Sequence, residues 1–394
     1  MIYLFTFLII AVLTFRYDIN GKKRYRDFCY FCILVLFVLI AGLRYRLGVD
    51  TTSYIFSFYH RIPDLQHISD MEDTMFAEPC FYFLCSFVKS IGGKFYHLQL
   101  IHAAFVNILL FFYIKKHSQY IYMCVLFYFL WAYTAYMMEE MRASMAVVLC
   151  FYGNDYMLER KWGKGLLLYA FAFLCHNSAI LLVVTPFLLF LRFNFWGFVL
   201  LSFVPVIEFY IQYQFEDYLL LASIEADVTN KASSYLSSER YLAEHNIFYY
   251  LINIVTLVFY SLLAFVKIKK ENNIKLLNLQ PIVIIGLMFV IMQNNSGIFY
   301  RYVSFYKIYF IFYFVEFVIL SLNKQDNLSE GVKIFRILVI CVPLLYSMVG
   351  KYKESYIRYY PYSSIFDKSV DQKREKEYRN LRTDIELIIR ENEY

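Results

Sequence analysis

Long apolar runs separated by short charged loops recur along almost the whole chain, and they constrain the fold more than any other feature. A helix needs about 20 mostly apolar residues to cross a bilayer, because its backbone polar groups must be bonded within the segment. The candidate segments are 2–15, 28–43, 77–92, 97–114, 121–138, 141–158, 165–191, 195–212, 247–266, 277–294, 299–321 and 333–350. Several are short, which predicts tilted, broken or re-entrant helices. The predicted fold is all-α, a polytopic transmembrane helical bundle of roughly 11–13 membrane segments.

Composition supports a membrane environment and argues against several other classes of protein. Soluble domains average roughly 45–50% apolar residues, whereas 60% of this chain is hydrophobic and 21% is aromatic. The formal net charge is +6, but most Lys and Arg residues lie in short loops, where they set orientation rather than bind nucleic acid. The 8 Cys residues fall mostly in apolar runs, so we expect no disulfide framework, no metal site and no cofactor.

Polar stretches divide the chain into a transmembrane domain, residues 1–350, and a charged C-terminal tail, residues 351–394. Within the first part, the mixed segment 44–76 and the acidic segment 213–246 are predicted to be external loops. Residues 370–392 of the tail are predicted to form a solvated helix because charged residues dominate them.

The distribution of basic residues predicts which loops face the cytoplasm. Loop 159–164 is basic, and so is the start of segment 195–212, so segment 165–191 should begin and end on the same side. A re-entrant pair of helices bent near His176 satisfies this, and such a bend is tolerated where it lines a cavity. One conflict is left open, because loop 16–27 and Lys115-Lys116 cannot both be cytoplasmic if 77–92 and 97–114 each cross fully.

Ionisable residues near membrane depth are candidates for function. Each also has a purely structural interpretation. Arg44 and Arg46, beside Gly48 and Asp50, and Arg301 would be interfacial anchors, and Tyr359, Tyr360 and Tyr362 would form an aromatic belt. Glu78 would cap a helix, Arg142 would pair with Glu139, and His176 would be a hydrogen-bonded core residue.

Three of these positions carry arginine: Arg44, Arg142 and Arg301. If the predicted topology holds for each, all three lie near the outer face of the bilayer. Guanidinium groups bind phosphate oxygens in bidentate fashion. The natural polyanion in the headgroup zone is a diphosphate, so these arginines are the predicted diphosphate ligands.

Several short motifs, taken in order, resemble the EpsG family, relatives of the Wzy polymerases of O-antigen and capsule. The resemblance begins with Arg44-Tyr45, Gly48-Val49-Asp50 and Tyr54. It continues with Glu78-Pro79, Arg142-Ala143-Ser144, His176-Asn177-Ser178, Arg301-Tyr302 and Tyr360-Pro361-Tyr362. The long charged tail after Tyr362 is not required by the family pattern.

The resemblance implies a multi-span (GT-C-like) glycosyltransferase, metal-independent and inverting, in the bacterial plasma (inner) membrane. Its substrate would be an undecaprenyl-diphosphate-linked oligosaccharide, joined into O-antigen, capsule or exopolysaccharide at the outer face. Implied partners are the lipid bilayer, a chain-length regulator and a flippase.

For the implied reaction, the acceptor hydroxyl needs a base. The candidates are His176 and Asp50, with Glu78 third. The motifs also suggest substrate-binding roles for Arg46, Gly48, Tyr54, Ser178, Tyr302 and Tyr362.

Two other functions fit parts of the pattern. A membrane O-acyltransferase of polysaccharide also favours an intramembrane His, but it does not need three outward arginines. A transporter or flippase of lipid-linked glycan often contains inverted repeats, and we find none in the sequence.

Overall fold

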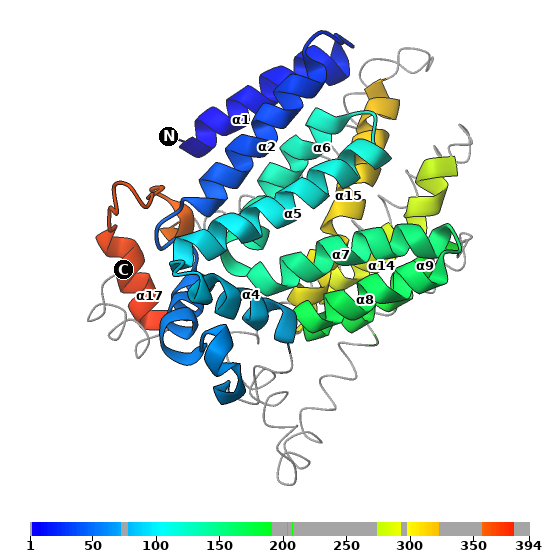
Figure 1. Cartoon of the computed structure of the whole chain (residues 1–394). Coiled ribbons are helices and arrows are strands. Elements are labelled where there is room, and N and C mark those ends of the chain that lie inside the picture. The colour runs from blue at the N-terminus through cyan, green and yellow to red at the C-terminus, as the bar shows by residue number, and fades with distance from the viewer. Residues whose placement is uncertain are drawn as a thin grey trace. The chain divides into compact units, whose positions relative to one another are not determined.

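The computed structural model describes residues 2–71, 78–190, 203, 207, 274–292, 298–322 and 357–381. The described elements are helical (Figure 1), and β pairing among them is limited to one isolated bridge. This confirms the all-α prediction for the described part of the chain. The chain divides into two compact units, one of residues Met1–Val183 and Cys341–Tyr394, the other of Val184–Ile340.

The first unit contains most of the described helices. They are α1 (Ile2–Leu13) with η1 (Thr14–Ile19), α2 (Arg26–Gly42), α3 (Val49–Phe56) with η2 (Ser57–Arg61), η3 (Leu65–Asp70), α4 (Pro79–Ser90), α5 (Phe95–His117), α6 (Ile121–Tyr128) with η5 (Phe129–Tyr133) and η6 (Ala135–Glu139), α7 (Met141–Leu158), α8 (Trp162–Cys175), η7 (Asn177–Val184) and α17 (Gln372–Leu381).

Two described helices are long and apolar enough to cross a membrane, Ile2–Ile19 with 18 residues and Phe95–His117 with 23. Shorter apolar helices accompany them, among them Trp162–Cys175 with 14 residues. The predicted total of roughly 11–13 segments therefore stays a prediction. Segments 247–266 and 333–350, the external loop 213–246 and nearly all of 195–212 lie outside the described residues.

Helices α2 and α5 pack side by side in opposite directions. At one end Gly42 meets Leu100 so closely that a Cβ on the glycine would lie 2.6 Å from Leu100 Cδ1. At the other end Lys115 Nζ lies 2.8 Å from Asp27 Oδ1. The start of α2 and the end of α5 therefore share one end of the unit.

Helix α4 does not cross between these ends. It has only 12 residues, about 18 Å at 1.5 Å per residue. Its last turn bonds to the segment after α3, because Ser90 Oγ accepts from the Leu65 amide at 2.8 Å and Lys89 Nζ donates to the Ile62 carbonyl. Its first residue is preceded by Glu78, which meets Arg142 and His176 at that same end. The crossing of 77–92 stays a prediction, but a helix placed in this way brings the two basic loops to the same end of the unit.

The next helices continue the alternation. The α6–η6 run starts beside η1, where the Met123 amide donates to Asp18 Oδ2 at 2.8 Å. It ends beside α3, where Thr51 Oγ1 donates to the Met138 carbonyl at 2.8 Å. Helices α7 and α8 then run back and forth, and Tyr169 of α8 donates to Asn154 of α7. The end that holds Gly48, Met138, Arg142 and His176 is called the motif end.

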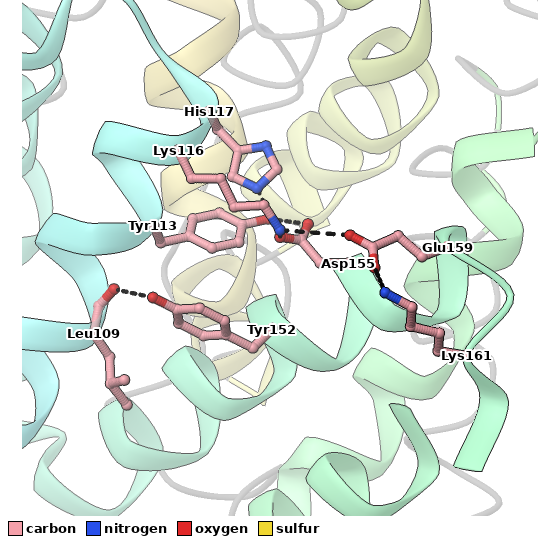
Figure 2. Close-up of polar contacts among 8 residues, drawn as sticks. All are labelled: Leu109, Tyr113, Lys116, His117, Tyr152, Asp155, Glu159 and Lys161. Atoms are coloured by element: carbon pink, nitrogen blue, oxygen red, sulfur yellow. Dashed lines mark hydrogen bonds and ion pairs between the residues drawn. The ribbon is translucent and has the colours of Figure 1, made fainter. Parts of the chain in front are cut away.

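The opposite end, called the basic end, carries Lys22, Lys23, Arg24, Arg26, Lys115, Lys116, Arg160, Lys161 and Lys164. Figure 2 shows how α5 and α7 are joined there around Asp155, whose side chain is 7% exposed. Its Oδ2 accepts from Lys116 Nζ and from His117 Nε2, both at 2.8 Å, and its Oδ1 accepts from Tyr113 at 3.4 Å. Glu159, at the end of α7, bonds to Lys161 at 2.7 Å.

The second unit contains α9 (Thr185–Phe190), α14 (Ile274–Met292) and α15 (Ile298–Leu322). Gly286 of α14 lies against Phe310 of α15, so a larger side chain would have no room there. Phe289 stacks on Tyr306 with ring centroids 5.7 Å apart. These contacts hold α14 and α15 together.

Candidate functional site

The first candidate segment follows α2 and is held in an extended turn that requires glycine. Gly48 has φ +94°, a left-handed conformation that other residues adopt at a cost. A Cβ at this position would also collide with the Met138 carbonyl. Gly48 thus allows η6 to approach and lets α3 begin at Val49 with Asp50 in its first turn.

Arg44 is almost completely buried, with 1% of its surface exposed. Its guanidinium donates to the Ala41 carbonyl, at the end of α2, and lies 3.6 Å from Met141 Sδ. Its predicted role as a diphosphate ligand stays a prediction, and in this structure its visible bonds are to protein groups.

Arg46 has a left-handed backbone, with φ +50°. Its Nη2 lies 3.1 Å from Glu375 Oε2 of α17, and the two side chains are 8% and 2% exposed. This pair could not be predicted from the sequence, because the two residues are 329 positions apart. The predicted substrate-binding role of Arg46 is not tested, but its guanidinium faces the C-terminal helix.

Glu78 brings together two of the predicted site residues. Its Oε1 accepts from His176 Nδ1 at 2.6 Å and from the Asn177 amide at 3.2 Å. Its Oε2 accepts from Arg142 Nη1. The side chains of Glu78 and His176 are 10% and 15% exposed, while that of Arg142 is 31% exposed.

The local backbone explains why these groups converge. Pro79 occupies the first turn of α4, where its missing N–H costs nothing, and leaves Glu78 as the flanking residue. Helix α8 ends at Cys175, and His176 is extended with φ −160° and ψ +122°. This confirms that the chain departs from helix α8 at His176-Asn177, as the sequence predicted.

Two tyrosines complete the surroundings of Arg142. The Tyr82 hydroxyl accepts from Arg142 Nη1 at 3.2 Å. The guanidinium carbon lies 5.9 Å from the Tyr82 ring centroid and 5.7 Å from that of Tyr54. Tyr54 was predicted, whereas Tyr82 was missed. Tyr82 follows Glu78 by four residues, a spacing that places both on one face of a helix. This spacing could have identified Tyr82 from the sequence.

Glu78 lies outside the crossing helices, and its ionisation is controlled by its neighbours. Burial alone would raise the pKa of Glu78, but the hydrogen bond from His176 and the charge of Arg142 outweigh it, so this pKa lies below its ordinary value. The carboxylate is therefore ionised at neutral pH. It accepts a hydrogen bond from His176 Nδ1–H, which leaves Nε2 as the nitrogen with a free lone pair when the ring is neutral.

Glu139 does not pair with Arg142, contrary to the structural alternative considered for that arginine. Its Oε1 instead lies 3.8 Å from Arg358 Nη1. Burial, and secondly the charge of Asp50, raise the pKa of Glu139. The sequence did not single out Arg358, which precedes the Tyr359-Tyr360-Pro361 motif. Glu139 and Arg358 form a second polar group at the motif end.

The remaining predicted residues are placed as follows. Ser178 lies in η7, two residues after His176. Tyr362 donates to the Ile40 carbonyl at 3.0 Å and packs against Tyr3 with centroids 5.9 Å apart. Arg301 and Tyr302 belong to α15 in the other unit, where the Tyr302 ring lies 5.7 Å from Phe289. The side chain of Arg301 lies outside the described part of the structure, so its convergence with Arg44 and Arg142 stays a prediction.

The arrangement offers three chemical functions within hydrogen-bonding reach: a histidine nitrogen, an ionised carboxylate that orients it, and a partly exposed guanidinium. Among the described residues, no group of three or more His, Cys, Asp or Glu side chains is arranged to hold a metal ion. The histidine nitrogen and its carboxylate can accept a proton, and the guanidinium can stabilise an anion.

Comparison with known proteins gives a family match. No curated protein and no solved structure matches the chain significantly. The sequence profile of the EpsG family matches residues 27–364, which cover the motif end and most of the chain. The chain therefore belongs to the EpsG family, a family of Wzy-like polymerases.

Proposed function

We propose that this protein polymerises undecaprenyl-diphosphate-linked oligosaccharide repeat units into a surface polysaccharide at the outer face of the bacterial plasma membrane. Family membership supports a role in polysaccharide polymerisation. The observation that carries the proposal further is that Glu78 binds both His176 and Arg142 at the end of the unit opposite the basic loops.

The charges favour an outward motif end. The basic end collects the Lys and Arg residues of three short connections, around 22–26, 115–116 and 160–164. Short cytoplasmic loops are enriched in these residues. The motif end then faces the outer leaflet, where a lipid-linked repeat unit would present its diphosphate in the headgroup zone.

In the proposed reaction, an acceptor hydroxyl attacks the anomeric carbon of the donor glycan. The bond between that carbon and the diphosphate oxygen breaks, and undecaprenyl diphosphate leaves with the electron pair. His176 Nε2 takes the hydroxyl proton, because Glu78 holds Nδ1 as the protonated nitrogen. Attack from the face opposite the leaving group inverts the anomeric configuration, and the reaction as written uses no metal.

Arg142 is the cation proposed to meet the leaving group. It is the more exposed member of the cluster, and its Nε has no hydrogen-bond partner in the structure. Negative charge accumulates on the diphosphate as the bond breaks, so a preplaced guanidinium stabilises the transition state more than the ground state. Arg44 and Arg301 are proposed as further ligands, and Asp50 as the alternative base.

The test replaces Arg142 with Lys or Ala, and His176 with Gln, in cells that lack the chromosomal copy. We expect loss of long polymer at normal protein level, with single lipid-linked repeat units accumulating outside. Arg142→Lys should fail because an ammonium group cannot make two parallel bonds to phosphate. Tyr152→Phe, on the other end of α7, is the matched control, since its hydroxyl bonds only to the Leu109 carbonyl.

The same assay separates the other two functions. Loss of a flippase leaves single units on the inner face, and loss of an O-acyltransferase leaves polymer of full length without acyl groups. Normal polymer length in both the Arg142→Lys and the His176→Gln strains would end the proposed assignment.

A further inference from the structure

The C-terminal segment 357–381 is bonded through its backbone to the first candidate motif. The Tyr45 amide donates to the Ser363 carbonyl and the Ile365 amide donates to the Leu43 carbonyl, both at 2.9 Å. These two bonds flank Arg44 on both sides and form an antiparallel bridge to Ser364. The backbone of residues 43–45 is therefore held by a segment from the far end of the chain.

A third backbone bond extends this contact to the critical glycine. The Gly48 amide donates to the Arg358 carbonyl at 3.2 Å. The hydroxyl of Tyr378 bonds to the Arg358 carbonyl at 3.1 Å and to the Arg46 carbonyl at 3.3 Å. The left-handed residues Arg46 and Gly48 are thus both fixed by the C-terminal segment.

Helix α17 was predicted to be solvated, and one face of it is not. Arg374, Glu375 and Tyr378 are each at most 2% exposed, while Lys373 and Lys376 are exposed. A charged helix buries such a face only where its polar groups find specific partners. Arg374 donates to the Pro361 carbonyl at 2.7 Å, and Glu375 pairs with Arg46. Figure 1 shows α17 beside the segment that contains α3.

The segment that α17 holds leads directly into the candidate site. Residues 43–48 set where α3 begins, and α3 supplies Tyr54, whose ring lies 5.7 Å from the Arg142 guanidinium carbon. A shift of the 43–48 turn would therefore move Tyr54 relative to Arg142. Since catalytic geometry tolerates displacements of well under about 1 Å, the anchoring of this turn matters for the reaction.

From these contacts we infer that the C-terminal segment is a positioning element of the site, and that Arg46 serves as its anchor through Glu375 rather than as a substrate ligand. The inference rests on the proposed function, because it concerns the rate of the same reaction. Glu375 and Tyr378 are positioning residues: they act through the backbone of residues 43–48 and touch no substrate.

The main experiment exchanges the charges of the buried pair. Arg46→Glu and Glu375→Arg are each expected to lower polymer formation about tenfold or more, because each leaves two like charges buried together. The double variant Arg46→Glu/Glu375→Arg is expected to recover most of the polymer. Lys376→Gln changes the charge of an exposed neighbour on the same helix and should have no effect. Persistent inactivity of the double variant at normal protein level would indicate that Arg46 binds substrate and would overturn the inference.

Kinetics in isolated membranes supply a readout that loss of folded protein cannot mimic. With lipid-linked repeat units as the probe, Glu375→Gln is expected to lower the saturated rate per folded protein and to leave the half-saturating concentration nearly unchanged. A raised half-saturating concentration with a normal saturated rate would contradict positioning through the backbone.

Docking of the segment can be followed without any polymerase activity. Ser363 is fully buried, whereas Ser369 is exposed. A cysteine at position 363 (Ser363→Cys) should resist a thiol reagent in the otherwise unchanged protein, react in the Glu375→Arg variant, and be protected again in the double variant. Ser369→Cys should react throughout. Equal labelling of Ser363→Cys in all backgrounds would show that Glu375 does not hold the segment.

The two proposals can fail separately. If Arg142→Lys and His176→Gln both retain polymer, the proposed function fails whatever the labelling of the segment shows. If Arg142→Lys loses polymer while Glu375→Arg keeps it, only the positioning role fails.

Discussion

Glu78 joins side chains that lie far apart in the sequence, because each of its two oxygens serves a different partner. One oxygen orients His176 and the other neutralises Arg142. The proposed base and the proposed anion ligand therefore have a common support, and substitutions at the three positions should not be additive. In the pair Glu78-Pro79, proline occupies the first turn of α4 and Glu78 stands just before the helix.

Glu78 should make the stability of the motif end depend on pH. Its pKa is lowered in the folded protein below the ordinary value of 4.5, so its contribution is complete above that value and is lost as pH falls through the lower folded pKa. Thermal unfolding of the detergent-solubilised protein should show a lower midpoint for Glu78→Gln than for the unchanged protein at neutral pH. The difference should narrow below about pH 4.5. A gap that stays constant into acid would contradict this.

Gly48 offers a second prediction with an internal control. Gly48→Ala adds strain at φ +94° and a collision with the Met138 carbonyl, whereas Gly92→Ala adds strain at φ +71° with nothing within 4 Å. We expect Gly92→Ala to cost about 1 kcal/mol and Gly48→Ala to cost about 3 kcal/mol or more, with loss of polymer only for Gly48. Equal unfolding midpoints for the two variants would show that the collision is relieved cheaply.

Among the elements, α4 is the helix whose length and placement differ most from what the apolar pattern suggests. The apolar residues of segment 77–92 suggest a membrane span, but hydropathy reports how many apolar residues a segment has, not whether its two ends meet the same loop. The positions of Lys89 and Ser90 against Ile62 and Leu65 decide this, and such contacts cannot be read from one sequence. By contrast, α5 was predicted at 97–114 and is observed at Phe95–His117, because its charges mark its end.

The join between α5 and α7 at the basic end carries a third prediction. Asp155→Asn removes the charge that Lys116 and His117 share, while Glu159→Gln changes a carboxylate that is 43% exposed. Because Lys116 is half exposed, we expect a loss of about 1–3 kcal/mol for Asp155→Asn and under about 0.5 kcal/mol for Glu159→Gln. Thermal unfolding measures both. Polymer length should be retained by each variant at permissive temperature, since this end is remote from the motif end.

For the whole molecule, the sequence indicated which residues would lie near one another better than it indicated which of them would pair. Arg44, Glu78, Arg142 and His176 were all named from motif type, and the structure places them at one end of the first unit. Their partners were missed or misassigned, because Glu139 is closer to Arg142 in sequence while Glu78 is the residue that meets it in space. The burial of one face of α17 was not predicted, because a run of charged residues indicates a solvated helix unless partners for those charges are known.

The arrangement of the two ends predicts the sidedness of the molecule. Cysteines introduced singly by Gln66→Cys and Lys368→Cys should react with a membrane-impermeant maleimide in intact spheroplasts. Those introduced by Lys22→Cys and Lys161→Cys should react only after permeabilisation, because they lie at the basic end. The unchanged protein is the control for its native thiols. Labelling of the 368 position only after permeabilisation would place the C-terminal segment inside and reverse the orientation.

The pairing of Arg46 with Glu375 also bears on how the protein is made. The two residues are separated by 329 positions, so most of the chain is synthesised before Glu375 leaves the ribosome. An incomplete nascent chain would contain residues 43–48 without the C-terminal segment that holds them. If the C-terminal segment positions the site as inferred, such a chain is expected to gain activity only after residue 375 has been synthesised and docked.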